Sequence, residues 1–356
     1  MEIKNYHVLG VMSGTSLDGL DIAHVVFSKG RDWGYDLRQA VTVPYPQQTK
    51  ELLEKGVDLD QAQLDELEKT LTQWFADAIN SFIARHQIKE LDAICSHGHT
   101  IKHEPENGMT LQIGNLPELA YLTGNRVVCD FRVQDVALGG QGAPLVPIGD
   151  KLLFGSYDYC LNLGGFANVS TDQEGIRIAY DICPVNTVLN YLSQKVGLPY
   201  DKDGRIATEG EVDQGLLEVL NEQEFYHRPA PKTLGIEWVN QVILPLIQDR
   251  KDIPVLMRTF ATHVAVQLSR HLGDSPNSKV LVTGGGAFNK FLMGELKART
   301  RAQIIIPPNR LVEYKEAIVF GFLGVLRMRG EVNTLSSVTG AREDHSAGNI
   351  FEPEQQ

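Results

Sequence analysis

The chain has 356 residues, 42% hydrophobic and 22% charged, which is typical of a soluble globular protein long enough for two domains. Its net charge of −12 argues against a nucleic-acid-binding protein, and no apolar run approaches the roughly 20 residues that cross a bilayer. The first residues lack a signal-peptide layout, and the four cysteines are scattered without a CxxC pair. We therefore expect a cytoplasmic protein with free thiols and no zinc site, nucleic-acid partner or membrane partner.

The most informative stretch is Met12-Ser13-Gly14-Thr15-Ser16-Leu17-Asp18-Gly19-Leu20-Asp21. Apolar runs at 7–11 and 22–27 flank it, which predicts two strands joined by a polar glycine turn. Such a turn offers N–H groups and hydroxyls to a phosphate, and its acids suit Mg²⁺ held through water. The candidate phosphate-binding residues are Ser13, Gly14, Thr15, Ser16, Asp18, Gly19 and Asp21, with Asp18 and Asp21 also the candidate metal-side acids. The alternative is an ordinary hairpin with a polar tip.

Strands and helices alternate through the rest of the first half. A strand is expected at 37–45, and apolar residues at three- and four-residue spacing predict a helix over 60–86. Short strands follow at 91–96 and 126–129, and a glycine-dense loop occupies 139–144.

Polar residues follow both short strands. The first is expected to end in an exit loop, His97-Gly98-His99-Thr100, whose histidines we expect to make local hydrogen bonds because their spacing does not suit a metal. After the second strand, Arg132 could clamp a carboxylate or phosphate through two parallel hydrogen bonds. The alternative for Arg132 is an ion pair with Asp130 or Asp135.

The second half, from about residue 151, repeats the opening pattern of strand, glycine turn and two further strands. Its predicted elements are strands at 157–163, 166–170, 175–180, 280–283 and 304–306, and helices at 184–196, 253–272, 288–297 and 316–328. Strands mixed with crossover helices indicate an α/β fold. The repeat suggests a duplicated nucleotide-binding fold whose two halves enclose a ligand cleft.

Three further features are candidates for chemistry. Asp181 ends a strand at the usual ligand edge of an α/β sheet and could be a general base or a metal-side acid; the alternative is a helix N-cap. Gly284-Gly285-Gly286 precedes a helix and could bind phosphate or only permit close packing. Glu316 is placed in the first turn of the last helix, where an acid favours the helix dipole. Walker A, GxGxxG and protein-kinase loop motifs are missing from the sequence.

Taken together, these strings closely resemble the anhydro-N-acetylmuramic acid kinase family over almost the whole chain. The matching stretches are Val11 to Gly19, His97 to Thr100, Leu111 to Gly114, Val128 to Arg132, Gly139 to Pro147, Asn162 to Asn168, Pro231-Lys232, Thr283 to Gly286, Glu316-Ala317 and Val338 to Ala341. The strings SGTSLDG and DFR…GGQGAPLVP are too specific for chance.

The resemblance implies the sugar kinase, Hsp70 and actin fold, with mixed β-sheets flanked by helices in two RNase-H-like lobes and ATP in a central cleft. The lobes would span 1–130, with 341–356 packing back on the first, and 131–340. The residues implied to bind ATP are those of the first loop together with Gly164, Gly165, Asn168, Gly284, Gly285 and Gly286.

The family reaction cleaves the 1,6-anhydro bond of anhydro-N-acetylmuramic acid with water and phosphorylates O6 from ATP, with Mg²⁺, during cell-wall recycling. The position matching the catalytic aspartate is Asp181, which would take a proton from the attacking water. The residues implied at the amino sugar are His97, Thr100, Arg132, Gly140, Gln141, Gly142 and Glu316. The resemblance also implies a cytoplasmic homodimer.

The sequence departs from the family pattern near Asp181. The usual string Asp-Thr-Gly-Pro-Gly-Asn is here Asp181-Ile182-Cys183-Pro184-Val185-Asn186, which could narrow the pocket. Elsewhere, His99 replaces the usual glutamine, Asp150 the usual histidine, and Leu234 and Ile236 alter a Ser-Thr-Gly-Arg segment. An active anhydro-sugar kinase remains the favoured hypothesis. The alternatives are a kinase for another amino sugar or polyol, and an ATP-binding regulatory module without sugar chemistry.

Overall fold

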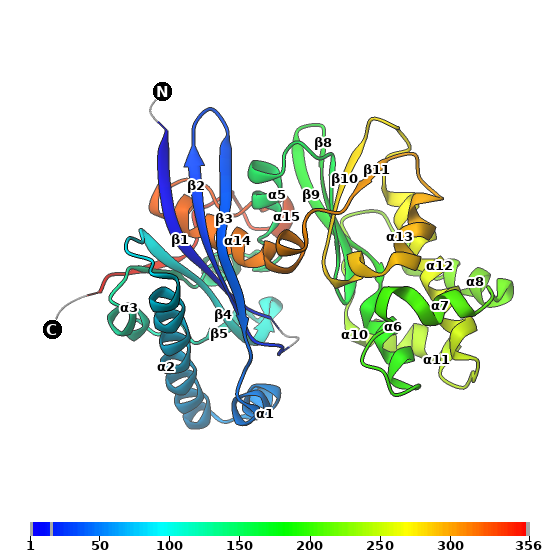
Figure 1. Ribbon diagram of the computed structural model, residues 1–356, viewed down its shortest axis with the longest axis horizontal. Coiled ribbons are helices and arrows are strands. Elements are labelled where there is room, and N and C mark those ends of the chain that lie inside the picture. The colour runs from blue at the N-terminus through cyan, green and yellow to red at the C-terminus, as the bar shows by residue number, and fades with distance from the viewer. Residues whose placement is uncertain (1–2, 15–16, 354–356) are drawn as a thin grey trace. The chain divides into compact units, whose positions relative to one another are not determined.

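The computed structural model describes residues 3–14 and 17–353. The chain forms two compact units, one of Met1–Leu153 and Tyr314–Gln356 and one of Phe154–Glu313 (Figure 1). The sequence motifs place the boundary at residue 130 instead. Residues 131–153 and 314–340, which the sequence assigns to the second lobe, lie in the first unit, as the hydrogen bond from Arg132 to His97 illustrates.

The first unit is a mixed sheet with helices. Its strands are β1 (Lys4–Ser13), β2 (Leu20–Lys29), β3 (Trp33–Val43), β4 (Ala93–Glu104), β5 (Met109–Ile113), β6 (Val127–Cys129) and β12 (Asn349–Phe351). Its helices are α1 (Gln47–Glu54), η1 (Gly56–Asp58), α2 (Gln61–His86), η2 (Pro105–Asn107), α3 (Glu118–Thr123), α4 (Val133–Ala137), α5 (Pro147–Leu153), most of α14 (Asn309–Met328) and α15 (Ser336–Thr339). The strand order is β12-β6-β4-β1-β2-β3, with β5 beside β4. Strand β2 runs antiparallel to both β1 and β3, whereas β4 and β6 continue parallel to β1.

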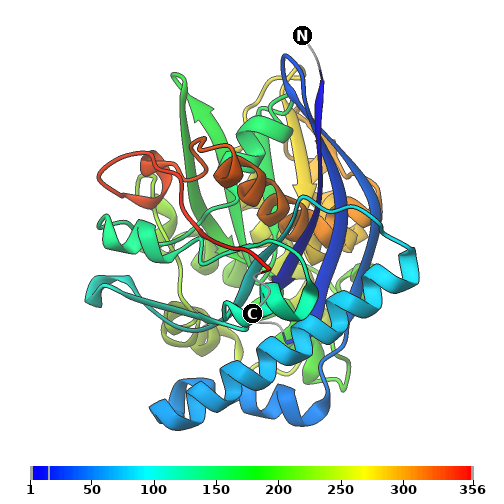
Figure 2. The ribbon, with the colours of Figure 1, turned by 90° about the vertical axis from the view of Figure 1, so that its left-hand side faces the viewer.

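The central strand β1 is buried on both faces, because its side chains alternate between two helical layers. Leu9 and Val11 join the core that α2 closes on one face. On the other face α14 packs so closely that a Cβ on Gly10 would lie 1.8 Å from the Ala317 carbonyl oxygen (Figures 1 and 2). This double burial explains why residues 8–12 read as a continuous apolar run.

The second unit repeats this topology. Its strands are β7 (Tyr159–Leu163), β8 (Phe166–Gln173), β9 (Ile176–Pro184), β10 (Lys279–Thr283) and β11 (Gln303–Ile305). Its helices are α6 (Asn186–Gln194), η3 (Lys202–Gly204), α7 (Arg205–Glu209), α8 (Gln214–Asn221), α9 (Glu224–His227), α10 (Ile236–Trp238), η4 (Val239–Ile243), α11 (Leu244–Ile247), α12 (Ile253–His271), η5 (Gly285–Phe288) and α13 (Lys290–Lys297). The order β9-β8-β7-β10-β11, with the first three strands antiparallel and the last two parallel to β7, matches β3-β2-β1-β4-β6. The predicted α/β fold with two RNase-H-like lobes is confirmed.

Three local predictions were wrong. Residues 97–100 are not an exit loop, because β4 continues to Glu104 with β5 as its partner. Glu316 does not lie in a first helical turn, because α14 begins at Asn309. Asp181 neither ends its strand nor caps a helix, because β9 runs to Pro184 and the N-cap of α6 is Val185.

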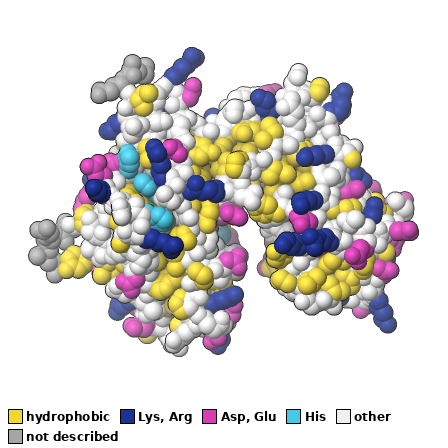
Figure 3. Space-filling view, in the orientation of Figure 1, with side chains coloured by type: hydrophobic (Ala, Val, Ile, Leu, Met, Phe, Trp, Pro, Cys, Tyr) yellow, Lys and Arg dark blue, Asp and Glu magenta, His cyan; other side chains and the backbone are white. Residues whose placement is uncertain are grey.

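No helix within the described residues combines the length and apolar character needed to span a membrane. On the face drawn in Figure 3, acidic and basic side chains are interspersed over both units.

The contact at Gly10 gives a stability prediction. Gly10→Ala should lower the free energy of unfolding by about 1–3 kcal/mol or more, because its methyl group collides with the α14 backbone. The control is Gly30→Ala, whose new Cβ would meet nothing closer than 4.0 Å. Urea unfolding followed by tryptophan fluorescence measures both, and equal midpoints would contradict the packing described here.

Candidate active site

The first glycine turn begins where β1 ends, at Ser13. Its hydroxyl lies 2.5 Å from the Tyr45 hydroxyl and 2.7 Å from His99 Nδ1, all three buried. Desolvation lowers the pKa of His99 to about 4, so the imidazole is neutral at pH 7. Ser13 is therefore held by the protein's own groups. The candidates Thr15 and Ser16 lie outside the described residues.

The far side of this turn is fixed by β3. A Cβ on Gly19 would lie 2.4 Å from the Val43 carbonyl oxygen, so only glycine fits there. Asp21 Oδ1 accepts a 2.6 Å hydrogen bond from the Thr42 hydroxyl on the paired strand, and Asp18 is exposed. Within the described residues, no group of three His, Cys, Asp or Glu side chains could hold a metal. That Asp18 and Asp21 hold Mg²⁺ through water stays a prediction.

Arg132 and His97 form a polar pair in the first unit. Arg132 Nε donates to His97 Nε2 at 2.8 Å, and Nη1 donates to the Gly142 carbonyl oxygen at 2.8 Å. Because His97 Nε2 accepts, its Nδ1 carries the proton and donates to the Gly98 carbonyl oxygen at 2.8 Å. Desolvation lowers the pKa of Arg132 to about 10 and that of His97 well below its usual value.

The alternative that Arg132 forms an ion pair with Asp130 or Asp135 is wrong for the residues described, since neither pair is made. Instead, Nε and Nη1 of Arg132 are bound to neutral acceptors. Its Nη2 group has no hydrogen-bond acceptor among the described residues, so its two N–H donors could bind an anion such as a carboxylate.

The glycine-dense loop is held by Asp135, which is fully buried. Its Oδ2 accepts the Gly142 N–H at 2.6 Å and its Oδ1 accepts the Thr339 hydroxyl at 2.7 Å. A Cβ on Gly140 would lie 2.2 Å from Asp135 Oδ2, so the loop needs glycine there. Gln141 is exposed, and its N–H donates to the Thr339 carbonyl oxygen at 2.8 Å. These hydrogen bonds hold the loop backbone in place and leave the Gln141 side chain exposed.

Glu316 and Thr100 are the remaining candidates in the first unit. Glu316 is exposed, yet desolvation by the surrounding protein raises its pKa, with the charges of Arg132 and Lys315 opposing the shift. The neighbouring Lys315 makes a buried 2.7 Å ion pair with Asp150, the residue that replaces the family's usual histidine. Thr100 Oγ1 accepts from Gln112 Nε2 at 3.3 Å.

In the second unit a row of polar residues crosses the sheet. Thr283 of β10 pairs with Asn162 of β7, which pairs with Asn168 of β8, which pairs with Asp181 of β9. Residues paired in this way project to the same face of a sheet. The ladder shifts by one residue beyond Asn168, where Ile182 is the extra residue of a β-bulge. Such a bulge re-aims the side chains around it.

Asp181 is the titratable member of this row. Its Oδ2 accepts the Leu234 N–H at 2.8 Å, and its own N–H donates to the Lys232 carbonyl oxygen at 2.8 Å. Desolvation raises its pKa, and the Leu234 hydrogen bond partly offsets that shift. Such a carboxylate is a stronger proton acceptor than one in water, as a general base requires.

The two glycine turns of the second unit lie side by side. A Cβ on Gly284 would lie 2.7 Å from the Leu163 carbonyl carbon, and one on Gly286 would lie 2.8 Å from the Leu163 Cβ. The carbonyl oxygens of Gly164 and Gly165 accept N–H groups at the start of α6, so the α6 amides are already bonded. Any phosphate here would be bound by other N–H groups of these turns. The helix after Gly286 begins at Lys290, later than predicted.

The residues altered after Asp181 are buried, and their effect on a pocket stays a prediction. The side chains of Ile182, Cys183 and Val185 are all 0% exposed and belong to the hydrophobic core. Their bulk replaces glycine and threonine within the core of the unit.

Sequence reasoning missed the supporting residues. Asp135 was considered only as an ion-pair partner, and Thr339, Asn162 and Thr283 had no assigned role. The sequence did contain a signal for Thr339, Asn162 and Thr283, because all three stand inside the stretches that match the family. Their contacts join segments up to 204 residues apart, which no local pattern reveals.

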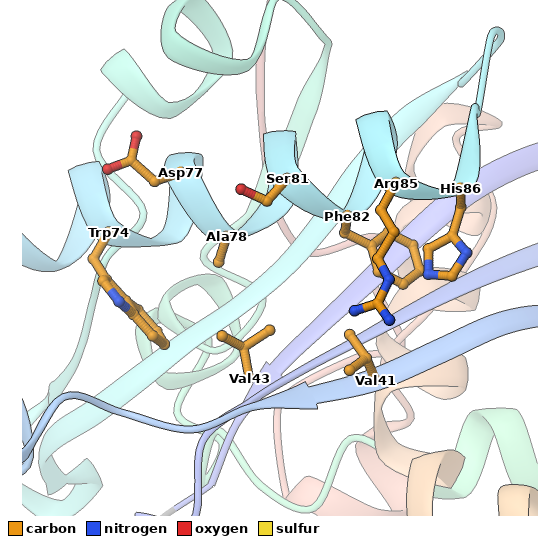
Figure 4. A pocket seen from close by; sticks show the side chains of 9 residues that line it. All are labelled: Val41, Val43, Trp74, Asp77, Ala78, Ser81, Phe82, Arg85 and His86. Carbon is orange, nitrogen blue, oxygen red and sulfur yellow. The ribbon is translucent and has the colours of Figure 1, made fainter.

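A pocket of about 310 Å³ lies in the first unit between α2 and β3 (Figure 4). Trp74, Ala78, Phe82, Val41 and Val43 give it an apolar lining, with Arg85 at one end. It contains none of the predicted site residues. Its Trp74 stacks on Tyr45 at 4.8 Å between ring centroids.

The model of the family "Anhydro-N-acetylmuramic acid kinase" matches residues 6–353. The chain belongs to the anhydro-N-acetylmuramic acid kinase family. An anhydro-N-acetylmuramic acid kinase of Vibrio cholerae is 34% identical and aligns over 97% of this chain and 98% of its own length. One of Xanthomonas campestris pv. campestris is 35% identical over 96% of both chains.

A solved structure of a ROK family glucokinase from Streptomyces griseus, in complex with glucose and AMPPNP, is 13% identical with a TM-score of 0.40. It covers 89% of this chain and 98% of that one. The membership of the anhydro-N-acetylmuramic acid kinase family does not depend on this loose likeness.

Asp135→Asn should lower the free energy of unfolding by about 1–3 kcal/mol, because an amide cannot accept at both positions and one buried donor loses its partner. The variant should also raise the KM for a sugar bound at the loop. Asp344→Asn is the control, since Asp344 bonds Ser336 at the exposed surface. Urea unfolding measures the stability, and substrate titration measures the KM. An unchanged free energy of unfolding together with an unchanged KM would contradict the role of Asp135.

His99 gives a pH prediction. Its pKa is about 4 when folded against 6.5 when unfolded, so the unfolded chain binds more protons between these values and stability falls as the pH falls through them. His99→Gln should remove up to about 1.4 kcal/mol per pH unit of that slope. Unfolding midpoints from pH 7.5 to 4.5 provide the measurement; parallel curves for both proteins would be the contrary result.

Proposed function

We propose that this protein is an ATP-dependent kinase that opens 1,6-anhydro-N-acetylmuramic acid with water and phosphorylates O6, giving N-acetylmuramic acid 6-phosphate in cell-wall recycling. The observation that carries the proposal is Asp181, a partly desolvated carboxylate with a raised pKa, in a chain that belongs to this family. One of its oxygens is bound to Leu234, and the other makes no protein hydrogen bond among the residues described.

In the proposed reaction Asp181 accepts a proton from a water molecule as the water oxygen bonds to C1 of the sugar. The C1–O6 bond breaks, and its electron pair lets O6 attack the γ-phosphorus of ATP. The bond from the γ-phosphorus to its bridging oxygen then breaks and ADP leaves. O6 needs no separate acid, because it captures a phosphoryl group instead of a proton.

The glycine turns would bind the phosphates of ATP. The residues assigned are Ser13, Gly14, Thr15, Ser16, Asp18, Gly19 and Asp21 in the first unit, and Gly164, Gly165, Asn168, Gly284, Gly285 and Gly286 in the second. Mg²⁺, when bound, would neutralise negative charge on the phosphates, with Asp18 and Asp21 holding its water ligands. The supporting observation is that the Gly284–Gly286 turn packs closely against the other glycine turn, where a Cβ on Gly284 would lie 2.6 Å from Asn162 Oδ1 and 2.7 Å from the Leu163 carbonyl carbon.

The amino sugar would be bound by Arg132, His97, Thr100, Glu316 and the loop from Gly140 to Gly142. The Nη2 group of Arg132, which has no partner in the described part of the chain, suits the lactyl carboxylate, since the other nitrogens are bonded to neutral acceptors. We further propose a cytoplasmic homodimer.

A kinase for another amino sugar or polyol is the second candidate. The observation that favours it is Ile236, which stands where the family usually has arginine and is 46% exposed. An exposed apolar side chain in place of a cation would change recognition of a charged substituent. Comparing ADP release across sugars with and without a carboxylate distinguishes the two candidates.

Asp181→Asn should leave the Kd for ATP within a few-fold of the unchanged protein while lowering kcat by about 10²–10⁴-fold, because the amide accepts no proton. ADP release with MgATP and anhydro-N-acetylmuramic acid gives the rate. Asp249→Asn is the matched control, because Asp249 is an exposed acid of the same unit. Unchanged turnover in Asp181→Asn would remove Asp181 from the mechanism.

A further inference from the structure

A short segment, residues 232–234, runs beside Asp181 at the outer edge of the second sheet, and we call it the strap. Strand β9 is the last strand of that sheet, so its outer backbone groups have no neighbouring strand. The strap takes that place at one residue: the Lys232 carbonyl oxygen accepts the Asp181 N–H at 2.8 Å, and the Leu234 N–H donates to Asp181 Oδ2 at 2.8 Å. Backbone and side chain of Asp181 are therefore both fixed by one segment.

The strap is anchored by the Lys232 side chain, which is only 7% exposed. Its Nζ donates to the carbonyl oxygens of Phe225 at 3.1 Å and Tyr226 at 3.4 Å, and lies 4.7 Å from the centre of the Phe225 ring. Lys232 has no carboxylate partner within the described part of the chain, and desolvation lowers its pKa. A buried ammonium group held only by neutral groups is costly, which points to a positional role.

Helix α9, whose Phe225 and Tyr226 carbonyl oxygens accept the hydrogen bonds of Lys232, is itself hydrogen-bonded to the core. The Tyr226 hydroxyl lies 3.0 Å from His263 Nε2, and His263 Nδ1 lies 2.8 Å from Asn221 Oδ1. Desolvation lowers the pKa of His263 to about 3, so this chain of hydrogen bonds stays neutral at ordinary pH. Buried hydrogen bonds and packing thus run from α12 through α9 and Lys232 to Asp181.

We propose that Lys232 is a positioning residue that, through the strap, orients the Asp181 carboxylate and keeps it ionised. Desolvation raises the pKa of Asp181, and the Leu234 N–H is the group that opposes the rise. If the strap moves away, Asp181 loses this donor and its pKa rises further. The inference rests on the proposed role of Asp181 as the base.

The first test compares Lys232→Met with Lys195→Met. Lys195 also donates to a backbone carbonyl oxygen, of Gln248 at 2.8 Å, and lies 4.8 Å from the Tyr191 ring, but it is exposed and distant in sequence from the strap. In Lys232→Met the acidic side of the pH profile of kcat, which we call the acid limb, should shift to higher pH by about 0.5–1 unit. Activity should therefore fall about 3–10-fold at the acid end and recover at high pH. Lys195→Met should keep the limb of the unchanged protein.

The second test removes the donor itself. Leu234→Pro deletes the N–H and should shift the same limb, whereas Leu234→Ala keeps the N–H and should not. A loss of activity that is equal at every pH in Lys232→Met and Leu234→Pro would indicate a merely structural role and overturn the inference.

A direct measurement of the Asp181 pKa separates this inference from the proposed function. The ¹³C carboxyl signal of Asp181, assigned by its loss in Asp181→Asn, is titrated in the unchanged protein and in Lys232→Met. A higher Asp181 pKa in the variant supports the strap even if the unchanged protein phosphorylates no anhydro sugar, which would refute the proposed function alone. Equal pKa values would overturn the strap even if the kinase is active.

Discussion

Burial of the central strand on both faces is the constraint on which the rest of each unit depends. The adjacent residues Val8 and Leu9 of β1 are 0% exposed, and Cys160 and Leu161 of β7 are 2% and 0% exposed, which leaves no room for polar side chains along most of either strand. Polar groups can therefore stand only toward the strand ends and in the turns that follow. Ser13, Asn162 and Thr283 all lie at such ends.

A second physical theme is that two cations among or beside the candidate site residues, Arg132 and Lys232, are bound by neutral groups. Arg132 donates to a histidine and a carbonyl oxygen, and Lys232 donates to two carbonyl oxygens. Neutral acceptors hold a cation in place without cancelling its charge, so Arg132 keeps its attraction for an anion. Asp135 is the corresponding buried anion: each of its carboxylate oxygens accepts a hydrogen bond from a neutral donor, Gly142 N–H or the Thr339 hydroxyl.

The sequence could predict much of the fold because local signals were strong. The glycine turns, the α2 periodicity and the repeat of strand, turn and strand depend on neighbouring residues, and the two sheets agree with them. The extension of β4 to Glu104 was missed because its partner β5 follows a separate turn. The burial of Ile182 and Cys183 in the core could not be predicted, because the one-residue β-bulge beside them leaves no mark in the sequence.

The candidate site was less predictable than the fold. Asp181 and Arg132 were candidates from their places after predicted strands, and the family resemblance then implied a role for each. The groups that hold them, Leu234 and His97, act across 53 and 35 residues of chain. Hydrogen bonds over such separations follow from tertiary structure, so the tautomer of His97 and the orientation of Asp181 could be derived only from coordinates.

The most direct test of the central claim is where the oxygen of water ends in the product. The protein is incubated with MgATP and anhydro-N-acetylmuramic acid in ¹⁸O-labelled water, and the sugar phosphate is fragmented in a mass spectrometer. The account predicts a product heavier than the substrate by one phosphoryl group and one water, with a single ¹⁸O at C1 and unlabelled oxygen at O6. A phosphorylated product that retains the anhydro bond, or one with ¹⁸O between C6 and phosphorus, would contradict the coupled hydrolysis and phosphorylation proposed here.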